Sequence, residues 1–168
     1  MSGYNHHSAP RKPDRRADHG VLPMTTGFDV AMTIHTLFAA LWTGGTLVVS
    51  GAVVPAARRE LLPTDGLTLI ARRFWYLTVA SVLFLLFSGG HLAGTLYTAE
   101  TLQTTGRGHR ILAMVGLWLV LAVTLFFGFR RLTGSQSGGA ATAATKARPW
   151  FLGASGVSIA LLVLAGLL

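Results

Sequence analysis

The sequence predicts an all-α integral membrane protein, an antiparallel bundle of four spanning helices, on three observations. Of the 168 residues, 51% are hydrophobic and 12% are charged, whereas soluble domains carry about 25% charged residues. Four runs without a charged side chain each approach the length of about 20 residues that a spanning helix needs. Three arginine pairs stand at the edges of these runs, where topology signals and head-group contacts are expected.

Each predicted span corresponds to one uncharged run. Aromatic side chains occur at several span ends, where their rings settle at the membrane interface. Pro149 suits the first turn of the last helix, because a proline there removes no helical hydrogen bond. The connection before it, residues 132–148, is rich in Gly, Ser, Thr and Ala and is expected to be a flexible loop. The predicted spans are residues 30–54, 74–97, 111–129 and 149–168.

The chain is expected to hold one folded domain. Residues 1–29 are polar, with prolines and histidines among charges, and are expected to be a disordered tail. Residues 30–168 form the four-helix transmembrane domain, and no length is left for a second domain. Short connections make consecutive helices antiparallel.

The distribution of basic residues predicts the orientation in the membrane. Loops one and three carry eight lysines and arginines, with arginine pairs directly beside the helices, against six in the tail and loop two. The positive-inside rule then places loops one and three in the cytoplasm. Both termini are therefore expected to be external, on a multi-pass protein of the cell or inner membrane.

Several function classes find no support in the sequence. With no cysteine, the chain has no ligands for thiolate zinc sites or iron–sulfur clusters and no disulfides. The net charge of +8 is not gathered on one basic face, so no nucleic-acid partner is expected. No Ser/His/Asp set, carboxylate pair, P-loop or HExxH motif occurs, so no catalytic residues are predicted. A redox role through a bound haem stays open.

Two histidines lie inside predicted spans. His35 is about 8 Å from the start of the first span and His91 about 9 Å from the end of the second, by helical rise. Antiparallel helices bring these two to the same depth, on the side predicted to be external. Ionisable residues in a span face the bundle interior by default, so both are candidate functional residues. Trp42 follows His35 by two helical turns on the same face and is a candidate cofactor contact.

Paired histidines at one depth allow different chemistries. They could bind copper with thioether help from Met32 or Met114, and His109 begins the third span on the same side. They could instead ligate a haem b iron axially, or form a proton or quinone site. The plain alternative is a hydrogen bond between helices. The predicted metal ligands are His35, His91, His109, Met32 and Met114.

Four short motifs occur in order between residues 30 and 132. They are His35 with Trp42 and Gly44-Gly45, then Arg72-Arg73-Phe74, the segment 102–114, and Arg130-Arg131-Leu132. Their succession resembles the CopD-like copper-resistance membrane proteins. The His-Trp-Gly opening also resembles the HemJ-type protoporphyrinogen oxidases, a related membrane group associated with haem.

The CopD resemblance implies a membrane protein that transports copper or delivers it from the outer face, with His35 as the functional histidine of the first helix. These families usually place a lysine early in the third helix, where this chain has Met114, and a thioether suits Cu(I) better. The alternatives are a haem-b protein of electron transfer or haem oxidation, and a non-catalytic accessory subunit. The expected partners are the lipid bilayer, copper or haem, and copies of the chain or subunits of a larger complex.

Overall fold

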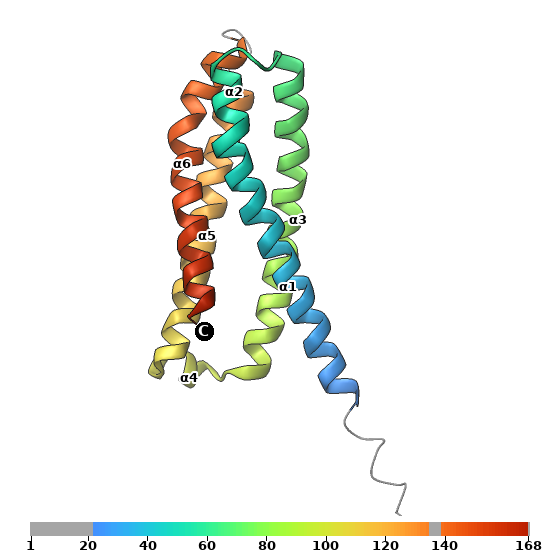
Figure 1. The fold of residues 1–168 in the computed structure, drawn as a ribbon. Helices are drawn as coiled ribbons and strands as arrows, with labels where there is room; N and C mark the ends of the chain where they lie inside the picture. Colours follow the sequence, from blue (N-terminus) through green and yellow to red (C-terminus); the bar gives the residue numbers. More distant parts are fainter. Residues whose placement is uncertain (1–21, 135–138, 168) are drawn as a thin grey trace, which may run out of the picture.

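The computed structural model describes residues 22–134 and 139–167, and in these ranges the chain is helical with no strand (Figure 1). Four of the helices in these described ranges are long and apolar enough to cross a membrane. The predicted fold class, an all-α membrane helical bundle, is thereby confirmed, and the protein is a multi-pass integral membrane protein. Most of the predicted tail, residues 1–21, lies outside the described residues.

The first spanning rod contains three consecutive helical segments. Helix α1 (Leu22–Val48) continues into a π-helical turn, η1 (Val49–Val53), and then into α2 (Val54–Arg58). Pro55 stands at the start of α2, where its missing N–H removes a bond from the helical ladder. The rod begins at Leu22, eight residues before the predicted span, so the helix is longer than the uncharged run.

The other helices also extend beyond their predicted spans. Helix α3 (Thr64–Leu96) begins ten residues before residue 74 and includes Arg72 and Arg73. A short helix, α4 (Ala99–Thr104), follows and is held by a capping box between Thr98 and Thr101. The remaining two spanning helices are α5 (Gly106–Thr133) and α6 (Gly139–Gly166).

The prediction of a loop over residues 132–148 is wrong for its second half. Helix α6 begins at Gly139, so Pro149 lies inside the helix rather than in its first turn. Alanine is the strongest helix former, and this segment is alanine-rich. Its alanines Ala143, Ala144 and Ala147 are buried, and α6 packs against α2 here. Helix propensity and this contact outweigh the glycine and serine content on which the loop was predicted.

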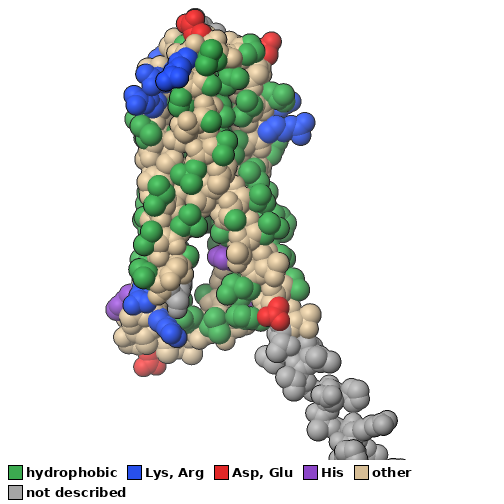
Figure 2. Space-filling model, in the orientation of Figure 1, with side chains coloured by type: hydrophobic (Ala, Val, Ile, Leu, Met, Phe, Trp, Pro, Cys, Tyr) green, Lys and Arg blue, Asp and Glu red, His purple; other side chains and the backbone are tan. Residues whose placement is uncertain are grey.

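The core is densest toward the end that carries the arginine pairs. There Phe129 of α5 contacts Phe74 of α3 and Phe151 of α6, with ring centroids 5.5 and 5.8 Å apart. Toward the other end, where α4 lies, the pair α1 and α3 diverges from the pair α5 and α6 (Figure 1). Figure 2 shows an opening between the two pairs, with histidine atoms beside it. The bundle is thus closed at one end and split at the other.

Candidate functional site around His35

His35 lies in the interface between α1 and α3. Its ring is half-buried, and Nδ1 is 3.0 Å from the hydroxyl oxygen of Ser88 on α3. One turn along each helix, Phe38 stacks on Phe84 with centroids 4.2 Å apart and an interplanar angle of 15°. The stacked rings align the two helices, so that the imidazole faces the serine.

The hydroxyl of Ser88 determines which nitrogen of His35 carries the proton. Ser88 donates its only hydrogen to the backbone carbonyl of Phe84, over 2.5 Å. With that hydrogen used, the Ser88 oxygen can only accept from His35, and this hydrogen-bond pattern assigns the proton of the neutral imidazole to Nδ1. The lone pair of Nε2 remains available, and no residue in the described part of the chain hydrogen-bonds to it. His35 can therefore act as a ligand or proton acceptor through Nε2.

Gly89 leaves the space that the imidazole occupies. A Cβ atom at this position would lie 3.0 Å from Cε1 and 3.4 Å from Nδ1 of His35. Contacts this short force a neighbouring side chain to move. The neighbouring Gly90 has no atom within 4 Å of its Cβ position. The two adjacent glycines therefore differ in whether a methyl group fits.

We expect Gly89→Ala to displace the imidazole from Ser88, whereas Gly90→Ala leaves it in place. Both substitutions gain helix propensity, but only the first overpacks the interface and breaks a hydrogen bond. Gly89→Ala should be less stable than Gly90→Ala by about 1–2 kcal/mol, measured by unfolding in mixed micelles. Imidazole ¹⁵N NMR should show a change of tautomer balance in Gly89→Ala alone. Equal stability and equal spectra would contradict this arrangement.

The other predicted ligands do not share this environment. His91 follows Ser88 by three residues on α3, and its side chain is exposed. Met32, one turn before His35 on α1, is 46% exposed. His109 and Met114 lie on α5, which packs mainly against α6. His109 is exposed and its Nε2 is 2.7 Å from the carbonyl of Gln103, a local contact before α5. Within the described ranges, no three His, Cys, Asp or Glu residues form a metal-binding group.

Trp42 is buried in the bundle, with 1% of its side chain exposed. Among the described residues, its Nε1 has no hydrogen-bond partner. Each of the other spanning helices also contributes an unpartnered buried polar group, and these are Thr78, Ser81, Trp118 and Ser158. An unpaired buried donor costs about 1–3 kcal/mol, so these groups lower the stability that packing of the helices provides. The interior is more polar than the apolar runs suggested.

Sequence reasoning missed Ser88 as the partner of His35 and Gly89 as the source of its space. A signal was present, because Ser88-Gly89-Gly90 places three small residues inside a span near the depth of His35. Small residues at the level of a large polar side chain indicate where that side chain can enter a helix interface.

Comparisons of the chain with protein-family models, with curated proteins and with solved structures gave no significant match.

Proposed function

We propose that this protein is a CopD-type membrane protein that binds copper through Nε2 of His35 and transports or delivers it. The supporting observation is the 3.0 Å contact between Nδ1 of His35 and the hydroxyl of Ser88. Because Ser88 donates to the carbonyl of Phe84, this contact favours the tautomer that is protonated on Nδ1 and keeps a lone pair on Nε2. Neutral imidazole is a common metal ligand, and a second-sphere hydrogen bond orients it and raises its basicity. The arginine pairs lie at the opposite end of the bundle, so the positive-inside rule puts His35 near the outer face.

Copper is favoured over harder metals by the donors at hand. Met32 precedes His35 by three residues and lies one turn away on α1, with its side chain 46% exposed. A thioether with an imidazole is a donor set that suits Cu(I). His91, His109 and Met114 remain predicted ligands, but the proposal depends on His35 because its ring is oriented by a partner.

Haem b is the second candidate, favoured by the opening between the helix pairs in Figure 2. Haem iron can be held by one axial histidine, and Nε2 of His35 is a suitable ligand. Trp42, the other predicted cofactor contact, is buried with its indole nitrogen enclosed by protein, so the haem proposal rests on His35.

Metal analysis and an absorption spectrum of the purified wild-type protein test these proposals. After chelator treatment and titration with Cu(I) in detergent, we expect stoichiometric copper retained against a competing colorimetric chelator. A Soret band in the purified protein, without retained copper, would select haem. If the protein shows neither retained copper nor a Soret band, both proposals are overturned. A detergent-solubilised mass that includes other co-purifying chains would then support an accessory subunit.

A further inference from the structure

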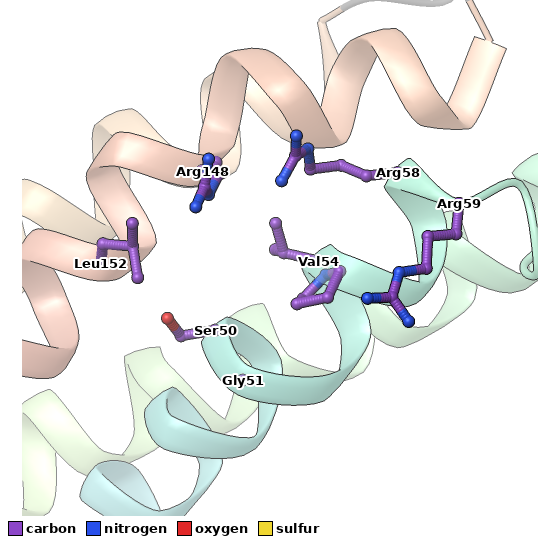
Figure 3. A pocket seen from close by; sticks show the side chains of 8 residues that line it. Ser50, Gly51, Val54, Arg58, Arg59, Arg148 and Leu152 are labelled. Atoms are coloured by element: carbon purple, nitrogen blue, oxygen red, sulfur yellow. The ribbon is translucent and has the colours of Figure 1, made fainter.

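A pocket of about 550 Å³ lies between the end of the first rod and α6, far from His35 (Figure 3). Three arginines line it, Arg58 and Arg59 from the end of the first rod and Arg148 from α6. No aspartate or glutamate is among its lining residues.

The π-helical turn helps to form this pocket. Gly51 lies in that turn and lines the pocket, and no atom is within 4 Å of its Cβ position. Pro55, just after the turn, cannot donate to the helical ladder, which favours the local widening of the helix. The backbone irregularity and the missing side chain therefore leave room beside α6.

Packing between α2 and α6 brings the arginines together. Ala57 of α2 and Ala144 and Ala147 of α6 are fully buried, at 0% exposure, and the two helices are in contact. Small buried residues allow helices in a membrane to approach closely. Arg58 and Arg148, which follow Ala57 and Ala147 directly, therefore extend from facing helices. Figure 3 shows their guanidinium groups near each other across the pocket.

The charges of these arginines are not balanced within the described ranges of the chain. Arg58, Arg59 and Arg148 are exposed, and none of their guanidinium groups makes a salt bridge or a hydrogen bond to another described residue. Like charges that converge repel each other, and an anion with several oxygens relieves this repulsion. Guanidinium groups bind phosphate oxygens in a bidentate geometry, which makes phosphate the best-matched anion.

The pocket also has an apolar side. Val54 is buried against the core, and Leu152 of α6 is 51% exposed on the surface of a spanning helix. Ser50 adds a hydroxyl at the same level (Figure 3). A soluble phosphate would use only the arginines, whereas a phospholipid places its phosphate and its acyl chain against both sides at once. Basic pockets between spanning helices at the cytoplasmic side are typical sites for anionic head groups.

We propose that this pocket binds the phosphate head group of an anionic phospholipid, with an acyl chain along Leu152. Arg58 and Arg148 hold the phosphate from two helices, Arg59 adds a third positive charge, and Gly51 provides the space. The bound lipid links the first rod to α6. This site is independent of any ligand of His35.

Native mass spectrometry of the full-length protein in detergent tests the proposal, with cardiolipin, phosphatidylglycerol, phosphatidylethanolamine and inorganic phosphate as separate probes. Wild type should retain the two anionic lipids in preference to phosphatidylethanolamine. Arg58→Gln/Arg148→Gln should bind them at least about tenfold more weakly, because charge-assisted contacts are lost. Gly51→Leu should also weaken binding, since it fills the pocket without changing the charge.

Arg72→Gln/Arg73→Gln is the matched control, because it removes the same charge from α3 outside the pocket and should bind as wild type does. Equal loss in both double variants would mean a general surface attraction and would overturn the proposal. Binding of inorganic phosphate that displaces the lipid equally well would assign the site to a soluble phosphate and would also overturn it.

Discussion

Replacing His35 by alanine is expected to weaken copper binding by the purified protein about a hundredfold or more. His35 supplies the one ring nitrogen in the α1–α3 interface that Ser88 orients and leaves available. Without it, the thioether of Met32 remains as a single weak ligand. Competition with a colorimetric Cu(I) chelator should show affinity falling by about a hundredfold or more, because loss of the oriented ligand exceeds the 10- to 100-fold effect of a second-sphere change.

Two further variants make this result specific. Ser88→Ala keeps the imidazole but removes its orienting partner, so affinity should fall by about 10- to 100-fold. His91→Ala removes a histidine whose ring is exposed and should have a smaller effect than either. If copper affinity survives in His35→Ala but is lost in His91→Ala, the assignment of the copper ligand to His35 is wrong. If the ligand is haem, the same three variants should reduce the Soret band in the same order.

Replacing Phe151 by alanine is expected to cause the largest loss of stability among the core variants. Phe151 is fully buried on α6, meets Phe129 edge-on, and lies against Gly128 of α5. Truncation leaves a cavity in the α5–α6 interface, and buried Phe-to-Ala changes cost about 3–5 kcal/mol. In lipid the loss comes from packing contacts rather than from exposure to water, so the low end of that range is expected. Unfolding by SDS titration, followed by far-UV circular dichroism, measures it.

Leu162→Ala is the matched control on the same helix, since Leu162 is 49% exposed. Its unfolding free energy should stay within about 0.5 kcal/mol of wild type, as for surface substitutions elsewhere. If Phe151→Ala proved as mild as Leu162→Ala, the aromatic cluster at the arginine end would not be the centre of the core.

The four spanning helices and their antiparallel order could be predicted from the sequence. A bilayer core about 30 Å thick demands long uncharged runs, and such runs are directly visible in the residues. The helix ends could not be predicted in the same way. An uncharged run marks only the part of a helix that lies in hydrocarbon, whereas α3 continues through Arg72 and Arg73 and α6 through its alanine-rich first turns. Outside the hydrocarbon a helix can carry charged residues, as α3 does, or pack against another helix, as the alanines of α6 do.

The sequence by itself also determined that His35 and His91 lie in adjacent spans at similar depth, because helical rise alone sets depth. The rotation of each helix was decided only in the tertiary structure. Stacking of Phe38 on Phe84 turns Ser88 and Gly89 toward His35, and His91, three residues further on, stays exposed. Rotation depends on which side chains interlock across the interface, and hydropathy carries no information about that.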